Sequence, residues 1–122
     1  AGWSVSSDRH LKEDFRPVDS RAVLDRLAAV PIAEWNFTGY PQRHVGPTAQ
    51  DFHAAFPFTD NDSSIDTGDL HGVALAAIQG LNRKLEETTQ RLAAENQALR
   101  QEVAELKALV RALAAKTPAQ TP

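Results

Sequence analysis

The sequence predicts an α+β protein in which a small mixed head of short helices and strands precedes a long C-terminal helix that forms a parallel coiled coil. Two changes in composition support this division. Every aromatic residue lies within the first 70 residues, and from Leu75 to Lys116 there is no proline and a single glycine. Ala, Leu, Glu, Gln and Arg, which favour helices, dominate that second stretch. Residues 71–116 are therefore expected to be one helix, and residues 117–122 a disordered tail.

The periodicity of this helix predicts a coiled coil. An apolar residue recurs every seven positions, as the d position of a heptad does. These d positions are Ile78, Leu85, Leu92, Leu99, Leu106 and Leu113. The matching a positions are Leu75, Asn82, Thr89, Asn96, Val103 and Val110. Flanking residues pair Glu95 with Arg100 and Glu102 with Lys107 in a parallel, in-register arrangement.

A single amphipathic helix packed along its own head is the alternative interpretation. A helix of some 40 residues would be about 60 Å long, which a head of this size cannot cover. Self-association is therefore favoured. The polar a positions fix register and parallel orientation, and Asn at a with Leu at d leans toward two strands.

In the first part of the head, we expect a helix and a strand. Asp19 or Ser20 can cap a helix that Pro31 ends. Alternation over residues 32–37 then predicts a strand. Its shared face consists of Ala33, Trp35 and Phe37.

In the second part of the head, a turn at 38–42 precedes a short extended piece at 45–49. A short helix follows at 50–56 and ends at Pro57. With so few large apolar residues, a head of about 70 residues has a thin core, which burial between subunits would help to stabilise.

The segment 59–69 is acidic and rich in turn-forming residues. It superficially resembles a calcium loop, but Ile65 stands where an EF-hand needs glycine, and no glutamate closes the loop. An ordinary loop is the preferred interpretation.

Composition excludes several classes of protein. The 122 residues contain no cysteine, so disulfides, thiolate zinc sites and thiol nucleophiles are absent. The four scattered histidines do not predict a metal site, and no cofactor is expected. The net charge of −3 does not suggest nucleic-acid binding. No apolar run approaches the roughly 18 residues of a membrane span, and residues 1–30 lack a signal-peptide core. Since the chain begins at Ala1 rather than Met, we expect a piece of a longer protein.

The first twelve residues place several hydroxyl groups near one lysine. The serines are Ser4, Ser6 and Ser7. Lys12 could activate a serine if burial left its amine neutral, as Ser-Lys pairs do on unrelated folds. Spacing alone is weak evidence for this chemistry. Asp8 is more typical of a helix cap or a surface charge, and His10 of a solvated side chain.

The order of segments resembles a known family. Residues 7–17 (SDRHLKEDFRP) resemble the S-D-x-x-L-K-x-x-I-x-P signature of the C-terminal intramolecular chaperone domain of phage tailspikes and tail fibres, the peptidase S74 or endosialidase type. The resemblance continues through residues 45–51 (VGPTAQD) and Phe56-Pro57, and reaches the helix that opens the family's coiled coil. It covers about residues 7–115. Departures are Phe15, Pro47, Phe52 and the acidic loop.

This resemblance implies a trimer that assists folding of the fibre or tailspike domain fused upstream and then detaches itself. Carried over, Ser7 would be the nucleophile and Lys12 its general base, with cleavage at Ser6–Ser7. Residues 1–6 would be the leader and residues 7–70 the chaperone head. Localisation would follow that of a phage tail-fibre precursor or a bacterial surface fibre. On oligomer number we follow the resemblance, because the head can also determine stoichiometry.

Two alternatives remain. One is a non-cleaving trimerisation cap with the same fold, and the other is a generic coiled-coil module with an unrelated head. Neither nucleic acid nor a membrane is expected as a partner. The residues do not reveal whether Ser7 attacks its own chain or a neighbouring copy.

Overall fold

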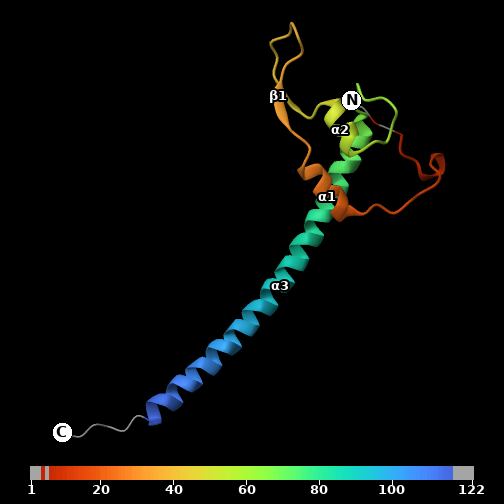
Figure 1. Ribbon diagram of the computed structural model, residues 1–122. Coiled ribbons are helices and arrows are strands. Elements are labelled where there is room, and N and C mark those ends of the chain that lie inside the picture. The colour runs from red at the N-terminus through yellow and green to blue at the C-terminus, as the bar shows by residue number, and fades with distance from the viewer. Residues whose placement is uncertain (1–3, 5, 117–122) are drawn as a thin grey trace. The chain divides into compact units, whose positions relative to one another are not determined.

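The computed structural model describes Ser4 and residues 6–116, in two compact units that divide between Leu81 and Asn82. The short elements and the first turns of the long helix belong to the first unit (Figure 1). In chain order the elements are a 3₁₀ helix η1 (Arg9–Leu11), α1 (Ser20–Ala28), β1 (Ala33–Trp35), β2 (His44–Gly46), α2 (Ala49–Ala55) and α3 (Thr67–Lys116). The predicted small α+β head followed by one long helix is confirmed. The tail expected at 117–122 lies outside the described residues.

Helix α1 begins and ends as its sequence predicts. The Asp19 side chain accepts a hydrogen bond from the backbone N–H of Ala22 at 3.1 Å, so Asp19 rather than Ser20 is the cap. The helix ends at Ala28, shortly before Pro31, because the residue preceding a proline avoids helical backbone angles.

The two strands form an antiparallel hairpin. Ala33 is paired with Gly46, Glu34 with Val45, and Trp35 with His44. Strand β1 is shorter than the predicted 32–37, but Trp35 and Phe37 still meet, with ring centroids 4.9 Å apart. The register also stacks Trp35 on His44 at 5.0 Å. Cross-strand aromatic contacts of this kind stabilise a sheet that has only two strands.

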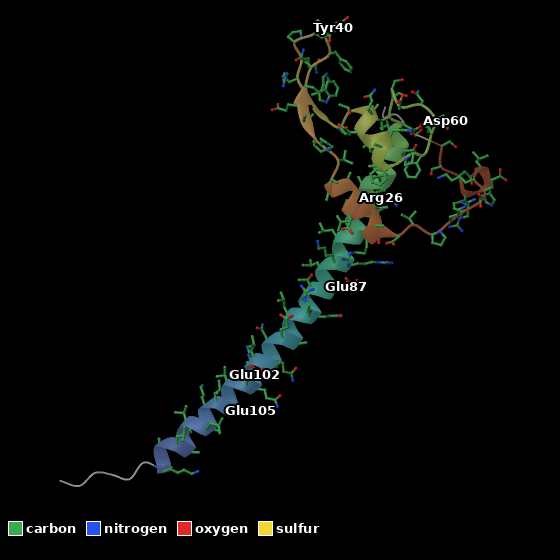
Figure 2. All side chains as sticks on the ribbon, in the orientation of Figure 1. Arg26, Tyr40, Asp60, Glu87, Glu102 and Glu105 are labelled. Atoms are coloured by element: carbon green, nitrogen blue, oxygen red, sulfur yellow. The ribbon has the colours of Figure 1, made fainter. Side chains whose placement is uncertain are left out.

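The hairpin's connecting segment is closed by one side chain. Asn36 Nδ2 donates to the carbonyl oxygens of Phe37 and Tyr40 at 3.1 and 3.0 Å. Its Oδ1 accepts from Arg43 Nη1 at 2.8 Å. Tyr40 marks the tip (Figure 2), beside Gly39 in the left-handed region at φ 84°. The Asn36 side chain thus holds together the segment that connects the two strands.

The second strand and α2 differ from their predicted bounds. Strand β2 starts at His44, and Ala49, expected in the extended piece, is the first residue of α2. The cause is Thr48, whose hydroxyl oxygen accepts from the Asp51 backbone N–H at 3.1 Å and caps the helix. The helix ends at Ala55, one residue before the predicted end at Phe56, which serves as its C-cap.

Helix α3 begins inside the segment predicted to be a loop. The Asp66 carboxylate accepts hydrogen bonds from the backbone N–H groups of Gly68 at 2.7 Å and Asp69 at 3.2 Å. These bonds satisfy donors that a helix start leaves free, so the helix begins at Thr67.

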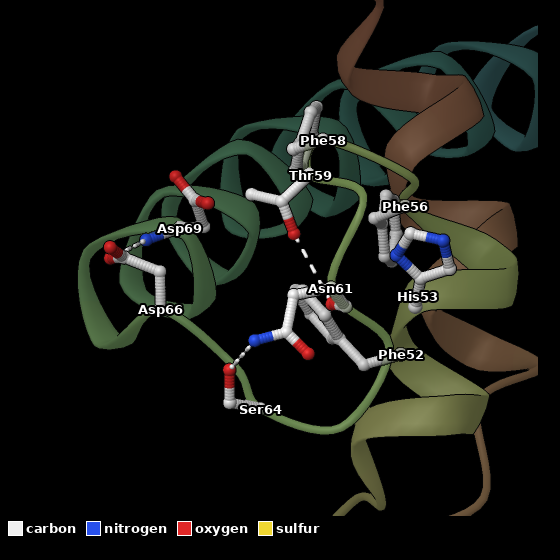
Figure 3. Close-up of a pocket in the computed structure, with 9 residues that line it drawn as sticks. All are labelled: Phe52, His53, Phe56, Phe58, Thr59, Asn61, Ser64, Asp66 and Asp69. Carbon is white, nitrogen blue, oxygen red and sulfur yellow. Dashed lines mark hydrogen bonds between the residues drawn. The ribbon is translucent and has the colours of Figure 1, made fainter.

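The preceding loop hydrogen-bonds to itself (Figure 3). Asn61 Nδ2 donates to the Ser64 hydroxyl at 2.8 Å, and Asn61 Oδ1 accepts from the Ser63 N–H at 2.9 Å. Within the described ranges, no group of three or more His, Asp or Glu side chains could hold a metal ion.

The head is built on a small hydrophobic core. Its buried members are Val30, Phe52, Phe56 and Val73. Partly buried side chains pack around them, namely Val23, Leu27, Ala55, Ile65 and Leu70. These side chains come from α1, α2, α3 and the residues next to them, so their packing holds the three helices together. Several large apolar side chains of the head stay exposed, including Phe15 and Phe58, so the core is as thin as predicted.

Gly80 marks a close approach between α1 and α3. A Cβ atom placed on Gly80 would lie 2.1 Å from the carbonyl oxygen of Ser20 and 3.1 Å from the Cβ of Leu24. Ser20 and Gly80 are both buried. The single glycine in a stretch of strong helix formers is therefore the residue that lets α1 approach α3.

Candidate functional site

The first part of the candidate site is a short turn after Ser7. Asp8 caps η1, because its carboxylate accepts from the backbone N–H of His10 at 2.9 Å. Two backbone bonds complete the turn: Leu11 N–H donates to the Asp8 carbonyl at 3.0 Å, and Lys12 N–H donates to the Arg9 carbonyl at 3.2 Å. Of the two interpretations of Asp8, the cap is confirmed.

This turn brings the predicted catalytic pair together. Lys12 Nζ donates a hydrogen bond to Ser7 Oγ at 2.5 Å, which is shorter than an ordinary N–H···O hydrogen bond. In an extended chain, five residues span about 17 Å, so the contact depends on the turn. Both side chains are exposed, as is Ser6 on the other side of the predicted scissile bond. The geometry allows proton transfer between hydroxyl and amine, while the catalytic roles stay predictions.

Hydrogen bonds within the turn favour the ionised form of Asp8. The backbone N–H of His10, and secondly its side chain, lower the pKa of Asp8 below its ordinary value of 3.8. His10 Nδ1 lies 3.0 Å from the same carboxylate oxygen. Beyond the turn, Asp14 adopts φ 55° and pairs with Arg16 at 2.8 Å.

The second part of the candidate site is the heptad face of α3. All twelve predicted core residues lie on this helix. The apolar ones are largely exposed; Leu75, Ile78 and Leu85 show 62–64% of their surface. Charged side chains such as Glu87, Glu102 and Glu105 also project from the helix (Figure 2). An apolar row of this length is typical of a surface that binds another protein.

The opposite face of the same helix is already occupied by the head. Val73, Ala77 and Gly80 are its buried residues. At about 100° per residue, these three point roughly opposite to Leu75 and Ile78. Within residues 67–81, the head therefore covers one face of α3 and leaves Leu75 and Ile78 exposed.

Three structural residues were not identified from the sequence. Thr48 precedes Asp51 by three positions and Asp66 precedes Asp69 by three, which is a spacing typical of helix starts. Gly80 could have been singled out as the only glycine among strong helix formers. All three signals can be read from the sequence: two helix starts and one close approach between helices.

A family model matches the part of the chain that begins at Ser7. Residues 7–60 match the family Peptidase S74, described as chaperone of endosialidase. The match begins at Ser7 and covers η1, α1, the hairpin and α2.

Two other comparisons gave no match, either to a curated protein or to a solved structure. Among the described residues, no helix is long and apolar enough to cross a membrane. The family match agrees with the resemblance carried by the sequence motifs. Residues 7–60 of this chain are therefore similar to the chaperone-of-endosialidase family.

Proposed function

We propose that this chain is an intramolecular chaperone that trimerises, assists folding of an upstream fibre or tailspike domain, and then releases itself by cutting the Ser6–Ser7 bond. The observation that carries the cleavage is the 2.5 Å contact between Lys12 Nζ and Ser7 Oγ, at the first residue of the matched segment. The family description supports the chaperone role. The upstream domain of the same polypeptide is the client, in a phage tail-fibre precursor or a bacterial surface fibre.

The proposed reaction uses only groups of this chain and water. Neutral Lys12 takes the proton of the Ser7 hydroxyl, and the oxygen attacks the carbonyl carbon of Ser6. The C–N bond between Ser6 and Ser7 breaks as the nitrogen of Ser7 takes up a proton. Water then hydrolyses the resulting ester, which leaves a carboxylate on Ser6 and a free amine on Ser7. A single turnover of this kind needs no substrate pocket.

The exposure of the heptad residues supports the proposed trimer. The head occupies the face of α3 that carries Val73 and Gly80, so partner helices can approach Leu75 and Ile78 without displacing it. Glu95 lies 3.9 Å from Arg91 in its own helix. Exposed pairs of this kind contribute little, about 0.3–0.5 kcal/mol, so Glu95 can exchange Arg91 for Arg100 of a neighbouring copy.

Assembly can also control the reaction. A lysine acts as a general base only when it is neutral, and burial favours the neutral amine. Lys12 and Ser7 are exposed in the single chain. Burial of the turn between copies would therefore activate cleavage once the trimer has formed.

Intact-mass spectrometry of the assembled chain tests the cleavage. We expect wild type to lose residues 1–6, and Ser7→Ala and Lys12→Ala to stay full length. Ser4→Ala is the matched control and should be cut like wild type, since Ser4 has no role in the proposed reaction. Full-length wild type in assembled trimers would exclude the peptidase.

A non-cleaving trimerisation cap is the second candidate function. The exposure of both dyad side chains favours it, because a lysine needs burial to act as a general base. It predicts a stable trimer whose Ser6–Ser7 bond persists, so the same mass measurement separates the two candidates.

A further inference from the structure

Asp8 makes the contacts that shape the turn between the two dyad residues. Its carboxylate accepts from the His10 N–H at 2.9 Å, and its carbonyl accepts from the Leu11 N–H at 3.0 Å. The turn then ends on Lys12, whose backbone is extended at φ −121° and ψ 147°. The hydrogen bonds that reverse the chain between Ser7 and Lys12 therefore lie within residues 8–12.

We propose that Asp8 is a positioning residue for the Ser7–Lys12 pair: its carboxylate caps η1 and thereby holds the lysine amine against the serine hydroxyl. The carboxylate itself does not touch the reacting atoms in this arrangement. This inference rests on the proposed function, because it assigns a role in the same self-cleavage.

The turn needs such a cap because little else holds it. None of the residues of η1 is buried, so hydrophobic packing within the chain does not fix their conformation. A helix of three residues forms few internal bonds, and a short helix without a cap is unfavourable in water. The side-chain bond from Asp8 is thus a large part of what stabilises the turn.

The two bonds between Asp8 and His10 differ in importance. The backbone N–H of His10 fixes the chain direction, whereas its ring only adds a second contact to the same oxygen, at 3.0 Å. Removing the ring leaves the cap in place. His10→Ala is therefore a matched control for changes at Asp8.

The test compares Asp8→Ala, Asp8→Asn and His10→Ala with wild type in the full chain. The rate of loss of residues 1–6 is followed by intact mass. We expect Asp8→Ala to cleave about tenfold more slowly, as loss of an N-cap predicts. Asp8→Asn keeps an accepting oxygen and should cleave within about twofold of wild type, and His10→Ala should behave similarly.

A second measurement does not depend on cleavage. Nuclear Overhauser contacts between Ser7 Hβ and Lys12 Hε report the pair directly, in Ser7-containing chains whether or not they cut. We expect the contacts in wild type, Asp8→Asn and His10→Ala, and their loss in Asp8→Ala.

The two readouts separate the inference from the proposed function. Wild type that keeps the contacts but never cuts would exclude the peptidase, while loss of the contacts in Asp8→Ala would still support Asp8 as the cap. Conversely, Asp8→Ala that cuts at the wild-type rate and keeps the contacts would overturn the positioning role and leave the peptidase intact. Slow cleavage in Asp8→Asn as well as Asp8→Ala would also overturn it, since an accepting oxygen would not suffice.

Discussion

At the scale of single residues, the spacing of the N-terminal motif has a local explanation. Asp8 ends the extended leader by capping η1, and four residues later the chain is extended again at Lys12. A serine just before the cap and a lysine just after the turn therefore come within 2.5 Å of each other. The motif builds its proposed site from six consecutive residues, without help from the core.

Acid should destabilise the turn. Hydrogen bonds from His10 lower the pKa of Asp8 in the folded chain below 3.8, so the carboxylate stabilises the turn above that value. This stabilisation is lost as the pH falls through the lowered pKa. An NMR titration of the His10 amide should show the folded shift at pH 5 and its loss well below pH 4.

The control for this titration is Asp8→Asn, which does not ionise. Its His10 amide shift should stay constant between pH 5 and pH 3. A wild-type amide whose transition lies above pH 4 would contradict the assigned direction.

The sequence predicted the Ser7–Lys12 pair, but it did not predict the turn that brings these two side chains together. The motif pairs Ser7 with Lys12, while Asp8 was assigned either to a cap or to a surface charge. Only the hydrogen bond to the His10 N–H decides between these two, because it depends on backbone angles that the sequence does not fix. The positions of Thr48 and Asp66 were missed although each carries an acidic residue three positions later.

At the scale of elements, the packing of α1 on α3 depends on Gly80. The Ser20 carbonyl occupies the space where a side chain would start. Because that obstacle is backbone, it cannot rotate away, and the helices would have to separate. Such a contact between elements distant in sequence could not be inferred from heptads or propensities.

Gly80→Ala should therefore destabilise the head. Alanine favours a helix over glycine by about 1 kcal/mol, but overpacking against a fixed neighbour costs about 1–3 kcal/mol. With a Cβ only 2.1 Å from the Ser20 oxygen, the clash should prevail and lower the free energy of unfolding. Urea denaturation followed by circular dichroism measures this change.

Gly72→Ala is the matched control on the same helix. Nothing lies within 4 Å of a Cβ at Gly72, so only the propensity gain of up to about 1 kcal/mol remains. We expect unchanged or increased stability. Equal effects of the two substitutions would show that Gly80 acts through propensity alone.

At the scale of the whole molecule, the sequence predicted the two-part organisation and the long helix but not the boundary between them. The helix begins at Thr67 because Asp66 caps it, four residues before the predicted start at 71. The head's exposed apolar residues and the open heptad face agree with a chain that completes its burial by association. Oligomer number cannot be derived from one chain, because a positions with Asn and Thr permit more than one state.

Association should depend on the d positions and not on the outward face. Burying one leucine contributes about 1.5–3 kcal/mol, and every copy of the assembly would lose this in Leu92→Asp. Sedimentation velocity at micromolar concentration should show a trimer for wild type and smaller species for Leu92→Asp. Ala94→Asp, two residues further along the helix, should remain a trimer.

A wild-type dimer in the same experiment would contradict the trimer and weaken the inferred chaperone role. If Ala94→Asp dissociated as readily as Leu92→Asp, the heptad assignment itself would be wrong, because an f position faces away from the seam.

Within residues 67–81, α3 carries the residues buried against the head and the first heptad residues, Leu75 and Ile78, on opposite sides. One residue inserted after Gly80 would rotate the later heptad positions by about 100° around the helix axis relative to Leu75 and Ile78, whereas seven inserted residues would leave the heptad register unchanged. The coiled-coil part of α3 can therefore differ in length by whole heptads and keep this register. A one-residue insertion would instead interrupt the heptad face that the copies are proposed to share.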